Sequence, residues 1–517
     1  MRWISQIFCS AALTAAIGTL STAPVMAQKS ADTMRIAINN PFPVLSQYQY
    51  SVDEATQFVE AVYEPLLSYD ERQRKWIPRL ATAWTRPNPT VLEFELRQGV
   101  KFHNGNDFNA DDVVATIEYL IDPNVKLRYK HYYSWIDKVE KLGPHKVRLI
   151  AKKPDATDLG QLAFHTDLQD AEAMKSLSNQ EDYGRLTPFG TGRYKVTQLD
   201  RNAGLIVDRY EGFVGNKDYT RASVKRIHGI FLPDRQTQIA QLMTGGVDVV
   251  FNLEPDQTKE LAQRKGIKVS HTPGGNILYI GFNASGSSGN KALTNPKVRK
   301  ALMMAIDRDS LIKNIVPGGE LAIKLDVPCF ESAVGCQYSS KPPAYDLDGA
   351  KKLLTEAGYP NGFDMELSVY APIQDVAVAI SGQLRRLGVN VAVEPLVFGT
   401  YRKKSDAGEF QAFSIYYPLG NFPDLSQLRT WFSGNTTFRY YENDPTIAKA
   451  MVDAGVELDP IKRAGLYEIV LNRVNEMHYL LPISTLPVAY AHGTNVRVSE
   501  HLLSTTSLDA TGLMFVD

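Results

Sequence analysis

The sequence is poor in the residue patterns that carry catalysis and metal binding. Its 517 residues include only three cysteines and nine histidines, and no two histidines lie within four residues of each other. A metal-binding pair of histidines on one helix turn is therefore absent. The chain also lacks a G-x-S-x-G nucleophile turn, a G-x-x-x-x-G-K-[ST] phosphate loop and a G-x-G-x-x-G dinucleotide loop. We expect no enzyme activity, no metal and no cofactor, although a dispersed set of catalytic side chains would leave no such pattern.

An excess of either charge is also missing. The 56 Lys and Arg residues nearly match the 57 Asp and Glu residues, which gives a formal net charge of −1. A basic field that could bind nucleic acid or an anionic membrane is therefore not expected. The length predicts two to four domains, each able to bury its own core.

Charge is scarcest at the N-terminus, where residues 1–27 hold a single charged side chain, Arg2. A mostly apolar run from Ile7 to Leu20 follows it, and Val25-Met26-Ala27 suits a signal peptidase. We predict export of the chain with cleavage after Ala27. An N-terminal membrane anchor is the alternative, but it needs a longer uninterrupted apolar span.

The cysteines fit an exported protein. Cys9 falls inside the predicted signal, which leaves Cys329 and Cys336 in the mature chain. In an oxidising compartment two cysteines this close are expected to form a disulfide. Two free thiols are the alternative.

One stretch, Leu92 to Leu120, predicts a strand, a turn and a capped helix in a single run. Apolar and acidic residues alternate from Leu92 to Leu96, which is the period of a strand with one buried face. Residues 103–106 read His-Asn-Gly-Asn, which is typical of a turn. Asn109 can cap a helix whose first turn holds Asp111 and Asp112.

The rest of the chain predicts an α/β fold. Residues 365–369 and 389–393 alternate as strands around a helical stretch at 375–387, which together form a β-α-β unit. Further helices are predicted at 53–63, 235–243, 346–357, 445–455 and 460–477, and further strands at 34–39, 146–152, 247–252, 412–417 and 481–488. A new structural block is expected to begin near Tyr279.

Five stretches resemble, in the same order, the bacterial extracellular solute-binding proteins of family 5, which include periplasmic oligopeptide-, dipeptide- and nickel-binding proteins. They are Leu92–Leu120 with Trp84 before it, FGTGRYKV from Phe189, NPKVRKALMMAIDRDSL from Asn295, YDLDGAKKLLTEAGYPNGF from Tyr345, and AISGQLRRLGVNV from Ala379. The resemblance implies a two-lobed periplasmic binding protein that closes about a hinge on its ligand. It also implies a peptide or peptide-like ligand, ABC permease subunits as partners and a monomeric state.

The layout of the family implies the domain boundaries. The first lobe is expected to comprise 28–63, 190–284 and 487–517. An inserted subdomain is expected at 64–189. The second lobe is expected to span 285–486.

The ligand site is expected in the second lobe. In peptide-binding members a segment resembling W-x-A-D-Y-P-D-P supplies an Asp for the α-amino group of the peptide. Here Asn421 stands at that position, and Asp424 replaces it only if the alignment slips by a few residues. The ligand-binding residues that we predict are Tyr416, Tyr417, Gly420, Asn421, Phe422, Asp424, Asn252 and Arg439, with Trp431 as a further member of an aromatic wall.

Two further features of the sequence leave ligands other than peptides as alternatives. Dipeptide-binding members place an Arg for the ligand carboxylate between a strand and a helix, but the matching connection, 370–374, contains none. Arg128 and His131 resemble a basic segment of nickel-binding members, or form a solvated basic face. An opine, a sugar derivative or a nickel chelate is therefore an alternative ligand. A secreted hydrolase is the alternative of another class.

The neutral amide at position 421 generates a prediction. An amide cannot compensate a buried ammonium group, and loss of one side of such a pair costs about 2–5 kcal/mol. Asn421→Asp should therefore tighten the binding of free-amino peptides, as measured by isothermal titration calorimetry. An affinity that is unchanged or weaker would place the amino-end site elsewhere.

Overall fold

The computed structural model describes residues 32–40, 44–48, 53–70, 73–215, 224–418, 424–428, 444–498 and 513–516. Its main feature is a ten-stranded sheet with the order β14-β13-β15-β12-β16-β11-β1-β10-β9-β8, and a four-stranded sheet has the order β4-β5-β7-β6. The strands are β1 Thr33–Ile38, β2 Leu67–Asp70, β3 Lys75–Pro78, β4 Ala81–Asn88, β5 Val91–Leu96, β6 Ile136–Gly143, β7 Lys146–Ala151, β8 Tyr194–Asp200, β9 Gly204–Arg209, β10 Arg226–Phe231, β11 Val249–Phe251, β12 Ile267–Phe282, β13 Asp364–Tyr370, β14 Asn390–Leu396, β15 Ala412–Pro418, β16 Leu480–Gly493, β17 Val496–Val498 and β18 Leu513–Phe515.

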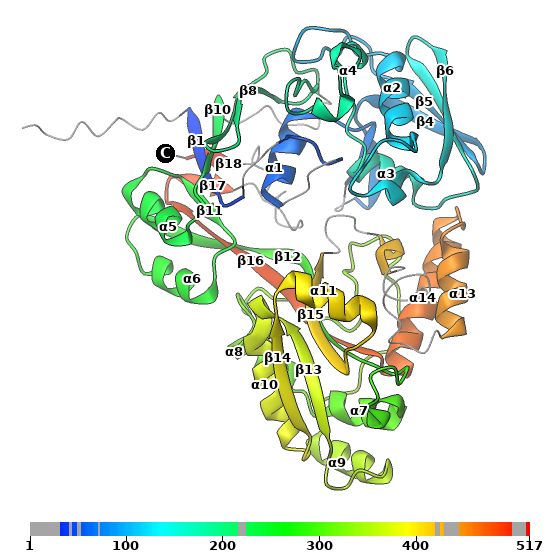
Figure 1. Cartoon of the computed structure of the whole chain (residues 1–517), viewed down its shortest axis with the longest axis vertical. Coiled ribbons are helices and arrows are strands. Elements are labelled where there is room, and N and C mark those ends of the chain that lie inside the picture. The colour runs from blue at the N-terminus through cyan, green and yellow to red at the C-terminus, as the bar shows by residue number, and fades with distance from the viewer. Residues whose placement is uncertain are drawn as a thin grey trace, which may run out of the picture.

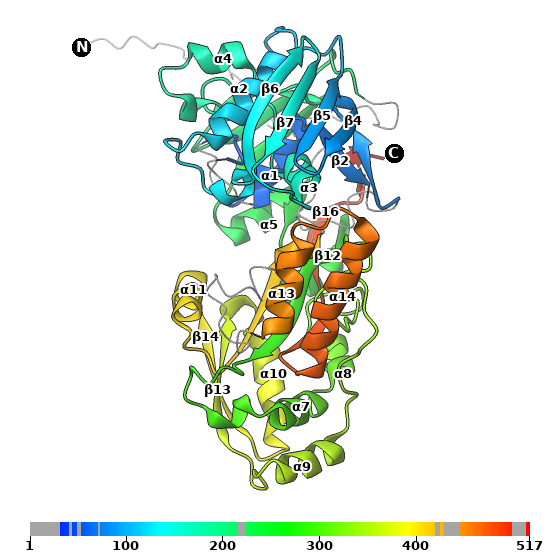
Figure 2. The ribbon, with the colours of Figure 1, turned by 90° about the vertical axis from the view of Figure 1, so that its right-hand side faces the viewer.

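The helices are distributed over two lobes that are joined by the long strands β12 and β16 (Figures 1 and 2). They are α1 Asp53–Val62, α2 Ala110–Ile121, α3 Asp158–Phe164, α4 Ala171–Ser176, α5 Arg235–Thr244, α6 Pro255–Ala262, α7 Pro296–Met304, α8 Arg308–Asn314, α9 Leu347–Glu356, α10 Gln374–Arg385, α11 Phe398–Ala407, α13 Pro445–Ala454 and α14 Pro460–Glu476. Strands β1 and β8–β11 belong to the first lobe, and β13–β15 belong to the second. The α/β, two-lobed architecture that the resemblance implies is confirmed.

The two lobes share a hinge in the antiparallel pair β12 and β16. Residues 267–272 of β12 pair with 488–493 of β16, and residues 276–281 pair with 480–486, with a break in register between Thr272 and Asn276. Gly274 lies in this break with φ +77°, and a Cβ at this position would lie 2.0 Å from the carbonyl oxygen of Leu486. Only glycine fits such a close approach without strain. The hinge therefore depends on backbone geometry as well as on side chains.

The stretch from Leu92 to Leu120 forms the predicted strand, turn and helix. β5 covers the alternating residues, and Asn109 caps α2 in a capping box with Asp112. Asp112 also accepts a hydrogen bond from the amide of Ala171 at the start of α4, 2.9 Å away. Burial raises the pKa of this carboxyl to about 6. Asp112 thus links α2 to α4.

The turn of this stretch binds the glycine turn that begins at Phe189. His103 Nε2 lies 3.0 Å from the carbonyl oxygen of Gly192, and the amide of Gly190 donates to His103 Nδ1 at 3.3 Å. Burial lowers the pKa of His103 to about 4, so its imidazole is neutral at pH 7. Two stretches that carry the family resemblance therefore contact each other in the first lobe.

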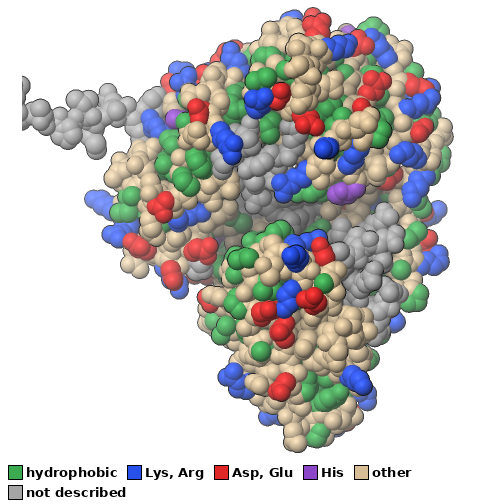
Figure 3. Space-filling view, in the orientation of Figure 1, with side chains coloured by type: hydrophobic (Ala, Val, Ile, Leu, Met, Phe, Trp, Pro, Cys, Tyr) green, Lys and Arg blue, Asp and Glu red, His purple; other side chains and the backbone are tan. Residues whose placement is uncertain are grey.

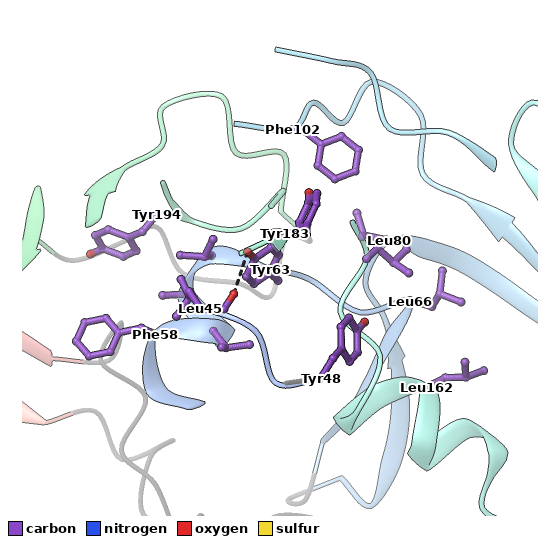
Figure 4. Packing of buried hydrophobic residues seen from close by; sticks show 14 of the residues in the cluster. Leu45, Tyr48, Phe58, Tyr63, Leu66, Leu80, Phe102, Leu162, Tyr183 and Tyr194 are labelled. Atoms are coloured by element: carbon purple, nitrogen blue, oxygen red, sulfur yellow. Dashed lines mark hydrogen bonds between the residues drawn. The ribbon is translucent and has the colours of Figure 1, made fainter. Parts of the chain in front are cut away.

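The core of the first lobe continues into the subdomain that carries β4–β7. Figure 4 shows Tyr48, Tyr63 and Tyr183 packed between α1 and the chain that leads to α3 and α4. The Tyr63 hydroxyl donates to the carbonyl oxygen of Leu45 at 3.2 Å. The subdomain therefore shares one hydrophobic core with the lobe from which it emerges.

Most predicted elements are present, and two predictions are incomplete. Helices α1, α5, α9, α10, α13 and α14 lie where the periodicity placed them, as do strands β1, β7, β11, β13, β14 and β15 in whole or in part. The strand predicted at 481–488 continues to Gly493 as β16, because it crosses from one lobe to the other. Helix α11 was not predicted, because its sequence, FGTYRKKSDA, has little apolar periodicity.

The hinge glycine generates a prediction. Gly274→Ala should lower the free energy of unfolding by about 1–3 kcal/mol more than Gly266→Ala, since a side chain at 274 collides with the backbone of β16. Gly266 is the matched control, because it has φ +85° but no atom within 4 Å of an added Cβ. Urea unfolding measures both variants, and equal losses would show that only the positive φ matters.

Candidate functional site

The candidate site is the edge of the second lobe at which three parallel strands end. β13 pairs in parallel with β14 and with β15, so Tyr370, Leu396 and Pro418 end their strands at the same edge. β15 is also antiparallel to β12, so the direction of the sheet changes there. Ligands of open α/β sheets bind at such a switch point, beyond the carboxyl ends of the strands.

This edge faces the first lobe. Figures 1 and 2 show α11, which follows β14, at the end of the second lobe that lies nearest the first. The surface is hollowed where the two lobes approach each other (Figure 3). A recess between two lobes that share a hinge is the geometry of a protein that closes on a solute.

The predicted aromatic wall is divided between the two faces of β15. Tyr416 packs against the core under α10, where its ring centroid lies 5.5 Å from that of Tyr370. Tyr417 packs against the other core, and its hydroxyl donates to Gln427 Oε1 at 3.2 Å. Neighbouring residues of a strand point to opposite faces, so these two tyrosines do not share one surface.

Asp424 lies in a buried cluster at the base of α14. Arg463 Nη2 is 3.1 Å from its carboxylate, the Tyr467 hydroxyl is 3.4 Å away, and the amide of Ser426 donates to it at 2.8 Å. The side chains of the ion pair are only 6% and 10% exposed. Asp424 is therefore the partner of Arg463 in this structure, and its contact with a ligand stays a prediction.

A disulfide loop supports the same cluster. Cys329 and Cys336 are joined, as expected for an exported chain. Val334 lies within the loop and forms an isolated parallel bridge with Asp424, and its carbonyl oxygen accepts from the amide of Leu425 at 3.1 Å. The disulfide thus fixes a short segment that borders the predicted ligand-binding stretch.

The same region joins the second lobe to the subdomain. The amide of Ala156, before α3, donates to the carbonyl oxygen of Gly455 at 3.0 Å. Arg463 Nη1 donates to the carbonyl oxygen of Ala156. Arg74 and Glu331 form an exposed ion pair at 3.3 Å between the β2–β3 turn and the disulfide loop. Sequence reasoning missed these contacts, because they join residues that are hundreds of positions apart.

The structure describes only some of the other residues that were predicted to bind a ligand. Asn252 directly follows β11, is exposed and has φ +53°, a conformation that Asn adopts more readily than most residues. Arg128 Nε donates to the Tyr129 hydroxyl at 3.1 Å, and burial lowers the pKa of His131. Four predicted ligand-binding residues and one wall residue lie outside the described residues: Gly420, Asn421, Phe422, Arg439 and Trp431.

Within the described residues, no group of three or more His, Cys, Asp or Glu side chains is arranged to hold a metal ion. In the same part of the chain, no helix has the length and apolar character that crossing a bilayer requires.

A sheet that passes through both lobes, a two-strand hinge and a recess between the lobes define a two-lobed binding protein. The model of the bacterial extracellular solute-binding proteins, family 5, matches residues 75–439 of the chain. The chain belongs to this family and serves an ABC importer as its periplasmic solute-binding component.

Individual relatives agree over nearly the whole length. The glutathione-binding protein GsiB of Escherichia coli (strain K12) is 28% identical over 494 residues, which cover 89% of this chain and 90% of the relative. The dipeptide-binding protein of Pseudoalteromonas sp. SM9913, solved with Met-Leu, has a TM-score of 0.73 at 22% identity and covers 94% of this chain and 100% of its own. NikA from Brucella suis, solved with Fe(III)-EDTA, has a TM-score of 0.79 at 21% identity with the same coverage.

The buried ion pair generates a prediction. Asp424→Asn leaves the Arg463 guanidinium without a compensating charge, so the free energy of unfolding should fall by about 3–5 kcal/mol. Asp453→Asn is the control, because it breaks an exposed pair with Lys449 on α13, which contributes at most about 0.5 kcal/mol. Chemical denaturation compares the two variants. A loss for Asp424→Asn as small as that of the control would show that solvent screens the Arg463 pair.

Proposed function

We propose that the protein captures a peptide or peptide-like polar solute between its lobes and hands it to the permease subunits of its importer. The observation that carries this proposal is the carboxyl-end edge of β13, β14 and β15, which faces the first lobe. Aromatic side chains on this edge and a hinge behind it suit a solute that is enclosed on both sides. Closure is then driven by contacts that exist only when both lobes touch the solute.

The relatives support a peptide-like ligand. GsiB is a glutathione-binding protein, and glutathione is a tripeptide with a γ-linked glutamate. The dipeptide-binding protein of similar fold holds Met-Leu. Glutathione and short peptides are therefore the first solutes to test.

The mature protein is proposed to be an exported monomer. The N-terminal pattern supports export with cleavage after Ala27. The protein then acts as a monomer and binds its solute without catalysis. A secreted hydrolase would need a catalytic set, and the sequence contains none of the common motifs for one.

A metal chelate is the second candidate ligand. NikA of similar fold binds Fe(III)-EDTA, an anionic chelate. The exposed Arg128 and the nearby His131 of the subdomain supply a positive charge and a neutral imidazole that suit such a complex. A whole chelate, unlike a bare ion, needs no set of protein ligands around the metal.

A ligand screen tests the proposal. The protein is unfolded, dialysed and refolded to remove any bound solute, and its melting temperature is followed with glutathione, Met-Leu, longer peptides, opines and nickel or Fe(III)-EDTA. A true ligand at about 100 times its Kd stabilises the folded state by about 2.7 kcal/mol, so the melting temperature should rise and saturate. Turnover of an ester or peptide substrate without any such shift would overturn the receptor proposal.

A further inference from the structure

Three aromatic side chains form a continuous row along the carboxyl edge of the second lobe. Tyr416 lies two residues before the end of β15, Tyr370 ends β13, and Phe398 begins α11 two residues after the last residue of β14. Their ring centroids are separated by 5.5 Å from Tyr416 to Tyr370 and by 5.8 Å from Tyr370 to Phe398. These spacings are those of rings in edge or tilted contact. We call these three residues, together with Val397, the aromatic row.

The outer end of the row is exposed. Phe398 is 56% exposed and Val397 is 68% exposed, whereas Leu396 before them is buried. Figure 3 shows hydrophobic side chains gathered on the second lobe near the start of α11, on the side of the recess. Two neighbouring apolar side chains left in water at the rim of a recess mark a surface that a ligand can cover.

The inner end of the row is held in place. Val369 and Tyr370 pair with Pro395 and Leu396 of β14, and Val369 also pairs with Ser414 of β15. Tyr416 packs on the core under α10. Because the strands fix these backbones before any ligand arrives, little conformational entropy is lost on binding.

The row also lacks charge. None of the residues 370–374, 396–400 and 412–418 is charged. The nearest charged side chains on these strands, Glu366 and Glu394, are both bound by Lys404, at 3.3 Å and 2.6 Å. A ligand carboxylate would find no partner along the row, and its desolvation would be unfavourable.

We propose that the aromatic row is a specificity subsite that receives an apolar or aromatic side group of the bound solute. This inference rests on the proposed capture of a peptide-like solute in the recess. A Leu or Phe side chain laid on Tyr370 and Phe398 leaves water on closure, while the polar backbone of the solute is bound elsewhere. The row therefore selects among peptide-like solutes by the side group at one end.

The test compares matched probes on refolded protein by isothermal titration calorimetry. The probes are Gly-Phe, Phe-Gly, Gly-Leu and Leu-Gly, each paired with its Ser analogue, and the corresponding tripeptides with a central Gly. Full burial of an apolar side chain contributes enough to change affinity by about 10- to 100-fold. At least one apolar probe should therefore bind about 10-fold or more tighter than its Ser analogue.

Variants assign this preference to the row. Phe398→Ala should remove most of it, and Phe398→Tyr, which keeps the ring, should retain it. Val452→Ala on α13 is the control, since Val452 is 59% exposed but lies outside the row. Because Phe398 is exposed, Phe398→Ala should fold, and its melting temperature without ligand verifies this.

The outcomes separate the two proposals. Wild-type protein that binds the peptides without preferring apolar side groups overturns the subsite alone, as does a preference that survives Phe398→Ala. Wild-type protein that binds none of the peptides overturns the proposed peptide ligand and the subsite together.

Discussion

The pairing of β12 with β16 is the constraint on which the rest of the molecule depends. These strands carry the sheet from one lobe to the other, and their register breaks between Thr272 and Asn276, where Gly274 lies against the backbone of β16. A Cβ added at Gly318, in the turn after α8, would lie 3.0 Å from His271 and 3.0 Å from Pro487 beside this break. A double strand resists shear but bends where its ladder is interrupted. We therefore expect the lobes to bend relative to each other at this break.

The stretch from Leu92 to Leu120 stabilises the first lobe through contacts that do not involve the hinge strands. Its turn, through His103, holds the glycine turn that begins at Phe189, and Asp112 joins α2 to α4. Buried polar groups that are satisfied in this way fix one arrangement of the backbone. The stretch that most clearly marks the family is thus a scaffold, in which His103 and Asp112 stabilise the fold.

The sequence predicts this scaffold better than it predicts the site. Capped helices such as α2 and α9 and the β13-α10-β14 unit follow from local periodicity. They can therefore be predicted from the sequence alone. The division of Tyr416 and Tyr417 between two faces follows from strand geometry, yet the pattern of two adjacent tyrosines suggested a single wall. The aromatic row joins residues 370, 398 and 416, and no local signal reports that three strand ends meet. The same holds for the contact of Ala156 with Gly455 and Arg463.

Charged side chains are absent from the described carboxyl ends of β13, β14 and β15 in the second lobe. The resemblance to peptide-binding members predicts an acid where Asn421 stands, the connection after β13 has no Arg, and the strand ends present rings in place of charges. Buried charges discriminate strongly because an unmatched partner is heavily penalised, whereas aromatic surface accepts any apolar group of suitable size. A lobe built in this way favours a solute whose end facing the row is apolar. Recognition of the charged ends of such a solute then falls to residues outside the row.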